Sequence, residues 1–222
     1  VPVLAASMPK LLGTDDAARL LCLQDLGPAR DLTSLYAGER LATAELATLI
    51  EWLAVLHASF RDYNDKASFV NREMRALNHM HIFVLPLASE PPSEFKREVT
   101  RLGEQYLEQG DCLLHGDFFP GSWLQSLEGT RVIDPEFCFF GPPEFDLGVM
   151  LAHLIFAGYE MPELSRLLLT YGPGIRERLV VQFAGVEIMR RLIGVARLPL
   201  TLDAQATARL LAQSREMVLA AA

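Results

Sequence analysis

The chain has 222 residues, half of them hydrophobic and 22% charged, which is ordinary for one large folded domain or slightly more. The net charge of −8 argues against a nucleic-acid-binding surface. No apolar run approaches the roughly 18 residues that a membrane-spanning helix needs. Three cysteines, Cys22, Cys112 and Cys138, lie in apolar stretches without a CxxC pair. We therefore expect buried free thiols and a reducing, cytoplasmic location.

The first 27 residues are predicted to form a strand, a turn and a second strand. Apolar residues 3–6 precede turn residues 13–16, and the run 19–23 is expected to be a buried strand. Two strands alone are marginal in water, so they need a partner sheet that this sequence does not contain. Because the chain opens on Val1 in what reads as mid-strand, we expect that an N-terminal part is missing.

The rest of the chain, residues 28–222, is predicted to be mainly helical. Apolar residues recur at helical spacing from Thr43 to His57, and His57 is interpreted as a core or interface histidine. Thr43 is a candidate N-cap for this helix, and Ser93 is expected to open another helix. The expected helices cover 43–57, 71–78, 93–106, 149–157, 162–170, 174–197 and 201–219. The pattern predicts an α+β fold with a small lobe over 1–27 and a helical lobe over 28–222.

The stretch from His115 to Gly148 concentrates carboxylates at strand ends. Asp117 follows the apolar run Cys112–Leu114, and Asp134 follows the short run Arg131–Ile133. We predict that these two runs pair as a hairpin through a Glu-Gly-Thr turn, which would bring the two carboxylates together. Packed like charges are unfavourable unless a cation or a proton intervenes. An oxygen-liganded cation such as Mg²⁺ is therefore expected here.

The order of these residues resembles a known family. HGD at 115–117, Ser122 and IDPE at 133–136 resemble the catalytic core of the protein-kinase-like aminoglycoside phosphotransferase and choline kinase superfamily, whose motif is HGDxxxxN followed by IDxE or IDxD. Ser122 in place of the usual Asn, the segment 134–148 and the paired Arg190 and Arg191 are similar to the methylthioribose kinases within it.

The resemblance implies a protein-kinase-like fold whose helical C-terminal lobe holds a central catalytic hairpin, below the last strands of an incomplete N-terminal β lobe. It implies that Asp117 accepts the proton of a substrate hydroxyl and that His115 orients the loop. Asp134 and Glu136 would bind Mg²⁺, and Ser122 would reach the ion directly or through water. A structural reading of Asp134 as a turn residue stays open.

The resemblance also implies ATP as the phosphoryl donor. Backbone groups of the hinge at Gln24, Asp25 and Leu26 would hold the adenine. Arg190 and Arg191 are expected to contact substrate or to form an internal salt bridge, with at most one of them facing the site well because neighbours on a helix point about 100° apart.

Taken together, these features predict an ATP- and Mg²⁺-dependent small-molecule kinase acting on a hydroxyl of a sugar-like or amino-sugar-like substrate, of methylthioribose or aminoglycoside type. Its expected partners are the nucleotide and the acceptor, with no nucleic acid or membrane and with a possible homodimer. Because the sequence contains neither a Gly-rich loop nor the strand lysine of such kinases, a non-catalytic binding or scaffold protein that keeps the helical lobe is the alternative. A metal-dependent hydrolase built on Asp117, Asp134 and Glu136 is a third interpretation.

Overall fold

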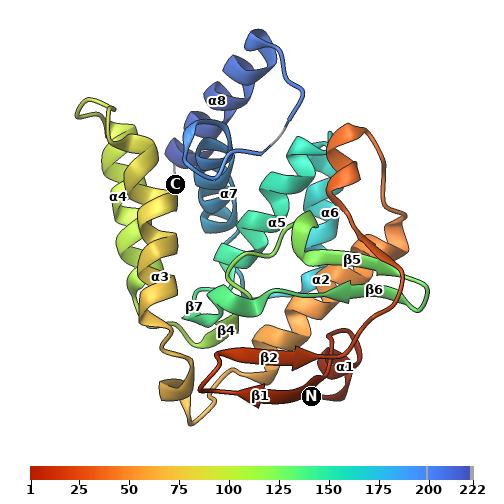
Figure 1. Ribbon diagram of the computed structural model, residues 1–222. Helices are drawn as coiled ribbons and strands as arrows, with labels where there is room; N and C mark the ends of the chain where they lie inside the picture. The colour runs from red at the N-terminus through yellow and green to blue at the C-terminus, as the bar shows by residue number, and fades with distance from the viewer. Residues whose placement is uncertain (199, 221–222) are drawn as a thin grey trace.

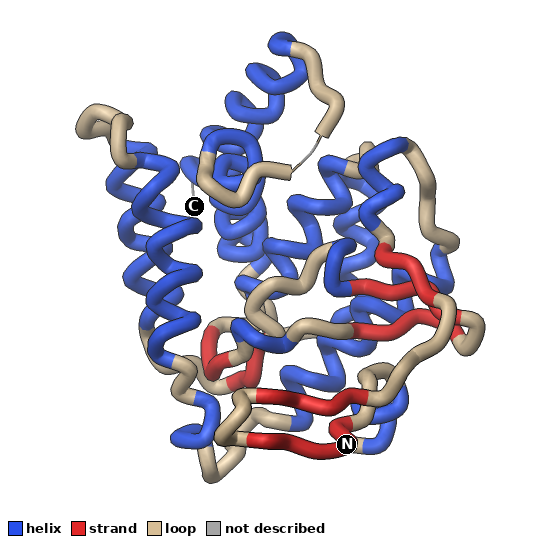
Figure 2. Tube along the Cα trace, viewed as in Figure 1, coloured by secondary structure: helices blue, strands red, loops and turns tan. Residues whose placement is uncertain are grey.

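A computed structural model describes residues 1–198 and 200–220. Helices make up most of the described chain, which also contains three small antiparallel sheets (Figures 1 and 2). This is the α+β architecture that the sequence predicts. The longer helices are α2 (Thr43–Ser59), α3 (Arg72–His79), α4 (Glu94–Leu107), α5 (Glu144–Phe156), α6 (Met161–Tyr171), α7 (Glu177–Ile193) and α8 (Ala204–Leu219).

Helices α5 and α7 form the centre of the helical part. Each contributes side chains to both hydrophobic cores, one shared with α2 and α6 and the other shared with α4. The two helices approach closely at Gly148, where a Cβ atom would lie 2.6 Å from Cβ of Phe183. The continuous apolar run after Gly148 therefore fits the prediction of a helix buried nearly all round.

Most helix boundaries follow the predicted periodicity. Helix α4 begins just after Ser93, close to where it was expected, and Ser93 is its N-cap, because the Ser93 hydroxyl accepts a hydrogen bond from the backbone N–H of Lys96 at 3.1 Å. Thr43 is not the N-cap of α2, since the helix begins with Thr43 itself and the Glu45 carboxylate accepts from the backbone N–H of Ala42 at 2.8 Å. The helices therefore lie close to their expected positions.

The strand pairing differs from the prediction. The hairpin consists of β5 (Trp123–Ser126) and β6 (Gly129–Val132), and its turn is residues 127–128, so only the glutamate of the predicted Glu-Gly-Thr turn lies in the turn and a different first strand precedes it. The run that precedes Asp117, β4 (Cys112–Leu114), instead pairs with β7 (Phe139–Gly141). The strand β3 (Ala29–Asp31) joins the other edge of β5. The buried pairing of β4 with β7 matches two wholly apolar runs, which local turn chemistry could not reveal.

The first 27 residues also differ from the prediction. Residues Pro2–Ala6 form the short helix α1 and not a strand, and β1 (Leu11–Asp15) pairs with β2 (Leu20–Leu23). The expected buried strand is exposed, with Leu21 70% accessible, because this two-stranded sheet lies at the edge of the molecule (Figure 1). Cys22 on β2 is consequently exposed, whereas Cys112 is buried and Cys138 is half-buried.

Helix α1 packs against the helical part of the chain. Leu4 is buried in the core that α2 and α5 share, and the Ser7 carbonyl accepts from the backbone N–H of Val132 at 2.8 Å. The division of the chain at residue 27 remains a proposal. In the described part of the chain, no helix combines the length and apolar character needed to cross a bilayer.

Candidate active site

The loop from His115 to Ser122, here the HGD loop, leaves the buried end of β4. Its first turn is held by Asp146 on α5, which is fully buried and accepts from the backbone N–H groups of His115 at 2.7 Å and Gly116 at 2.9 Å. Asp146 braces this loop and does not cap its helix, because it lies inside α5, whose N-cap is Pro143.

A buried histidine supports Asp146 from behind. His57 on α2 bonds the Asp146 carboxylate through Nε2 at 3.1 Å, while its Nδ1 lies 2.9 Å from the Tyr171 hydroxyl. His57 is completely buried. The prediction of a core histidine is thus confirmed. Through its bond to Asp146, His57 also supports the HGD loop.

His115 and Ser122 close the HGD loop on itself. His115 is buried, with Nε2 2.9 Å from the Ile133 carbonyl and Nδ1 accepting a long bond from the Asp117 N–H at 3.4 Å. The Ser122 hydroxyl donates to the Asp117 carbonyl at 2.7 Å, and the Ser122 carbonyl accepts from the Ile133 N–H at 3.0 Å. Ile133 therefore ties Asp134, the next residue, to both ends of the loop.

Two arginines meet on one oxygen of Asp117. Nη2 of Arg190 lies 2.9 Å and Nη2 of Arg191 lies 3.0 Å from Oδ1 of Asp117. The expectation that at most one arginine would face the site is wrong. Both long side chains converge because Glu187, three and four residues earlier on α7, binds each guanidinium through its Nε. The arginines are therefore in internal ion pairs and border the site at the same time.

The charges around Glu187 compensate one another. Burial alone would raise the pKa of Glu187, but Arg190, Arg191 and His153 outweigh it and hold that pKa well below its usual range. Burial would likewise lower the pKa of Arg190, yet Glu187 and Asp117 raise it. Both groups are therefore charged at neutral pH, which a buried ion pair requires.

The cluster extends to two residues that the sequence analysis did not single out. His153 on α5 lies 3.0 Å from Glu187 through Nε2, and its Nδ1 lies 2.5 Å from the Tyr36 hydroxyl. Burial lowers the pKa of His153 to about 4, despite its bond to Glu187. Burial also raises the pKa of Tyr36. This histidine is therefore neutral at physiological pH.

The loop 134–138, here the DPE loop, carries the predicted metal ligands. Asp134 adopts a left-handed conformation (φ 59°, ψ 54°) directly before Pro135, an uncommon and strained state for a residue other than glycine. Asp134 and Glu136 are exposed, and neither carboxylate makes a hydrogen bond within the described chain. The described residues contain no group of three His, Cys, Asp or Glu side chains that could hold a metal.

This donor set fits Mg²⁺ better than it fits a metal enclosed by protein ligands. Mg²⁺ is commonly bound by one or two carboxylates, with waters and substrate phosphates completing its shell. Two free, exposed carboxylates on one short loop satisfy that requirement. A metal-dependent hydrolase needs a fuller protein shell, so the residues argue against that interpretation.

Two asparagines, one at the N-cap of α3 and one within it, each bond to one of the two loops. Asn71 donates to the carbonyls of Glu136 at 2.8 Å and Cys138 at 2.9 Å, and the buried Asn78 donates to the Gly116 carbonyl at 3.2 Å. A Cβ atom at Gly116 would lie 2.2 Å from the Phe137 carbonyl oxygen, so only glycine fits at this φ of +87°.

The predicted hinge, residues 24–26, bonds mainly to its own neighbours in the described chain. Gln24 extends the β1–β2 pairing through its N–H to the Lys10 carbonyl at 2.8 Å, and Asp25 forms a turn with Gly27 at 2.8 Å. Within the described chain, the backbone groups of Leu26 make no hydrogen bond. None of the three residues bonds to another predicted site residue in that part of the chain.

Of the residues that were missed, Glu187 had the clearest signal, since a glutamate three and four positions before two arginines is a helix ion-pair pattern. His153 lies in an apolar run and Tyr36 in a short 3₁₀ turn (Thr33–Ala37), and neither spacing distinguishes them. Asn71 and Asn78 read as ordinary helix-end residues.

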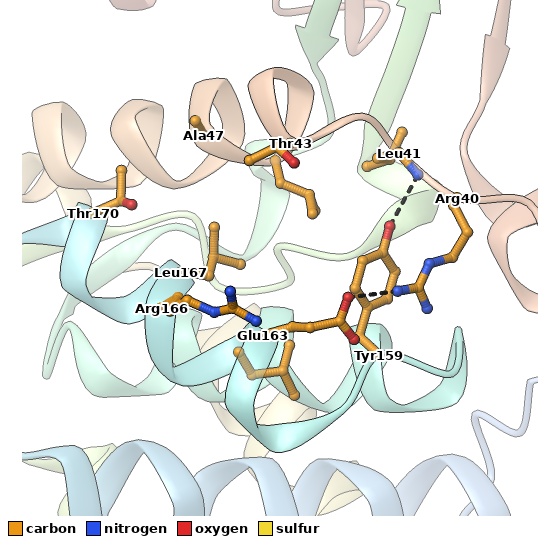
Figure 3. Close-up of a pocket in the computed structure, with 11 residues that line it drawn as sticks. Arg40, Leu41, Thr43, Ala47, Tyr159, Glu163, Arg166, Leu167 and Thr170 are labelled. Carbon is orange, nitrogen blue, oxygen red and sulfur yellow. Dashed lines mark hydrogen bonds and ion pairs between the residues drawn. The ribbon is translucent and has the colours of Figure 1, made fainter.

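A separate cavity of about 530 Å³ lies between α2 and α6 and is lined by none of the predicted site residues. Figure 3 shows Arg40 paired with Glu163, at 2.7 Å, and the Tyr159 hydroxyl accepting from the Leu41 N–H, at 2.9 Å. The Arg40 guanidinium also lies over the Tyr159 ring. Arg40, Glu163 and Tyr159 at this cavity are thus already bonded within the chain.

Comparison with known proteins identifies the family of the chain. Residues 3–180 match the family described as "Phosphotransferase enzyme family". The chain belongs to this phosphotransferase family. The resemblance inferred from the HGD and IDPE motifs is therefore confirmed.

Curated proteins similar to this chain include methylthioribose kinases. The chain is 36% identical to that of Exiguobacterium sibiricum, over 47% of this chain and 36% of the relative. It is 31% identical to that of Geobacillus kaustophilus, over 58% of this chain and 46% of the relative. The chain thus spans less than half the length of these two relatives.

Solved structures of kinases share the fold. Choline kinase LicA from Streptococcus pneumoniae has a TM-score of 0.57 at 14% identity, over 97% of this chain and 76% of that chain. LicA in complex with AMP gives 0.61 at 13%, over 96% and 74%. A choline/ethanolamine kinase family protein from Mesorhizobium loti gives 0.57 at 16%, over 98% and 79%. The predicted protein-kinase-like α+β fold is confirmed.

Proposed function

We propose that this chain carries the acceptor site and catalytic base of an ATP- and Mg²⁺-dependent small-molecule kinase that phosphorylates a hydroxyl group. The observation that carries the proposal is the geometry of Asp117. Oδ1 accepts from two guanidiniums, whereas Oδ2 has no hydrogen-bond partner in the described chain. One oxygen is thus fixed, and the other is free to receive a proton.

Each residue of the HGD loop has a defined role in this proposal. Asp117 binds the acceptor hydroxyl through Oδ2, orients it for in-line attack and takes its proton. His115 and Ser122 keep the backbone of Asp117 in place through their bonds to Ile133 and to the Asp117 carbonyl. Arg190 and Arg191 border the acceptor and fix Oδ1 of Asp117 through their two ion pairs.

The nucleotide and the metal are assigned to the two remaining groups of residues. When bound, Mg²⁺ neutralises charge on the transferred phosphoryl group. Asp134 and Glu136 would hold it, and Ser122, buried and already bonded to Asp117, would act only through a water. The free backbone groups of Leu26, with Gln24 and Asp25 beside it, would receive the adenine. The strained backbone of Asp134 supports a catalytic role over a non-catalytic scaffold, because strained backbone conformations cluster at functional sites.

The charge of the site favours one acceptor class over another. The carboxylates of Asp117 and Glu187 are matched by two guanidiniums, so the cluster presents no excess negative charge. A polycationic aminoglycoside would be repelled by the two arginines beside the base, and the cluster offers no excess of carboxylates to bind its positive charges. A neutral sugar such as methylthioribose fits this environment, and the named relatives support that acceptor. The free thiols support the reducing, cytoplasmic location that we propose.

The test is an acceptor screen with the natural full-length protein, following ADP release and the phosphorylated product. We expect Mg²⁺-dependent phosphorylation of methylthioribose and none of an aminoglycoside. Asp134→Asn keeps the shape and tolerates the left-handed backbone, so it should remove Mg²⁺-dependent transfer without loss of thermal stability. A protein that binds no Mg-ATP at millimolar concentration would refute the proposal.

A further inference from the structure

We infer that Tyr36, His153 and Glu187 form a positioning chain that aims the two arginines at Oδ1 of Asp117 and so sets the rate of phosphoryl transfer. The inference rests on the proposed function. It concerns residues that do not touch the reacting atoms, and it assigns a role to a buried histidine and a tyrosine that the proposed mechanism leaves unused.

The side chains of this positioning chain are joined by an unbroken series of hydrogen bonds. The Tyr36 hydroxyl lies 2.5 Å from Nδ1 of His153, and Nε2 of His153 lies 3.0 Å from Oε1 of Glu187. The same Oε1 accepts from Nε of Arg191 at 2.8 Å, while Oε2 accepts from Nε of Arg190. His153 and Glu187 are buried. A single path of hydrogen bonds therefore leads from Tyr36 to Asp117.

Only one arrangement of protons satisfies this path. The ionised Glu187 carboxylate can only accept, so Nε2 of His153 must carry the proton that it shares with Glu187. Nδ1 of the neutral ring is then an acceptor, and the Tyr36 hydroxyl donates to it. Each group has one role, and removing any of them leaves a buried partner unsatisfied.

Glu187 determines where the guanidiniums point. Each arginine binds Glu187 through Nε and Asp117 through Nη2, so the planar fork of each guanidinium spans the two carboxylates. Rotation of the Glu187 carboxylate would turn both forks away from Asp117. The bond from His153 opposes that rotation, and Phe119 under Arg191, 4.7 Å from ring centre to guanidinium carbon, leaves little room for it.

The element that bears Tyr36 is itself fixed to the HGD loop. The backbone N–H of Leu32, just before the 3₁₀ turn, donates to the carbonyls of Pro120 at 3.0 Å and Trp123 at 3.1 Å. The positioning chain therefore begins on an element that is bonded to the HGD loop through its backbone, and it ends on the side chain of Asp117 in the same loop.

The experiment compares steady-state kinetics of the full-length protein, on the acceptor found by the screen, with Mg-ATP binding measured separately. Tyr36→Phe should lower kcat roughly three- to tenfold, the effect of one neutral hydrogen bond. His153→Phe breaks the chain on both sides and should lower kcat about 100-fold, as a misplaced catalytic group does. The KM and Kd for Mg-ATP should stay within about twofold.

Two further variants separate positioning from stability. His153→Gln can donate to Glu187 and accept from Tyr36, so it should recover most of the lost kcat. Tyr159→Phe also removes a buried tyrosine hydroxyl that bonds an adjacent segment, at Leu41, but it has no link to Asp117. It should cost stability and leave kcat unchanged.

If Tyr36→Phe and His153→Phe match Tyr159→Phe in kcat, the inference is wrong while the proposed function stands. If His153→Phe fails to fold, the milder Tyr36→Phe decides alone. A wild-type protein that binds Mg-ATP and phosphorylates no acceptor overturns the proposed function and this inference with it.

Discussion

Asp146→Asn is the substitution that most directly tests how the HGD loop is held. The Asp146 carboxylate accepts three buried hydrogen bonds, from the N–H groups of His115 and Gly116 and from His57. An amide keeps one acceptor oxygen and turns an N–H group toward at least one of these donors. The change therefore removes charge assistance from every bond and leaves a buried donor without a partner.

The expected cost can be worked from these contacts. A hydrogen bond to a charged group contributes about 1.5–3 kcal/mol, and a buried unsatisfied donor costs about 1–3 kcal/mol. With one bond lost and the others weakened, we expect unfolding free energy to fall by about 3 kcal/mol. A domain typically has about 5–15 kcal/mol, so the variant should still fold.

Urea unfolding followed by tryptophan fluorescence measures this cost at the right place. The chain has two tryptophans, and both pack on Phe118 of the HGD loop, with ring centroids 5.6 Å away for Trp52 and 5.2 Å for Trp123. Asp111→Asn, just before β4, is the matched control. Within the described residues, the Asp111 side chain makes only a surface pair with Lys66 at 3.5 Å, and such exposed pairs contribute about 0–1 kcal/mol. A loss below about 0.5 kcal/mol for Asp146→Asn would refute the reasoning.

Three further outcomes follow from the same structure. Burial lowers the pKa of His153 from 6.5 to about 4, so the unfolded chain binds a proton at this residue at a higher pH than the folded chain does. The free energy of unfolding should therefore fall by about 3 kcal/mol between pH 6.5 and pH 4 because of this site. In His153→Gln, the free energy of unfolding measured in urea should depend less on pH over this interval. Gly116→Ala places a Cβ atom 2.2 Å from the Phe137 oxygen, so calorimetry should show a loss of roughly 2 kcal/mol or more, and an unchanged melting temperature would contradict it. Asn71→Gly removes two bonds to the DPE loop without backbone strain, so amide exchange at residues 134–138 should rise about tenfold by mass spectrometry, whereas wild-type protection there would rule out the role of Asn71.

The helical lobe could be predicted because its helices carry strong 3.6-residue periodicity, and the capping of α4 by Ser93 follows from one residue type at one position. The strands were harder. Cys112–Leu114 and Phe139–Gly141 are short apolar runs whose pairing depends on the helices around them, and no turn joins them. The exposure of β1 and β2 likewise depends on where their two-stranded sheet lies relative to the rest of the molecule.

The residues of the candidate site likewise divide into those that the sequence predicts and those that it does not. Asp117, Asp134 and Glu136 follow from a motif in which residue type and spacing carry the chemistry. The convergence of Arg190 and Arg191 does not, because helical angles alone direct neighbouring side chains apart. Long side chains and the shared partner Glu187 override that geometry. Tyr36 and His153 enter only through contacts between residues distant in sequence.

Single-turnover transfer from bound Mg-ATP to the acceptor, in the full-length wild type and in Asp117→Asn, tests the central claim most directly. A positioned base contributes about 10²- to 10⁴-fold, so Asp117→Asn should slow transfer at least about 100-fold while Mg-ATP affinity changes little. Equal transfer rates in the two proteins would contradict the assignment of Asp117 as the base.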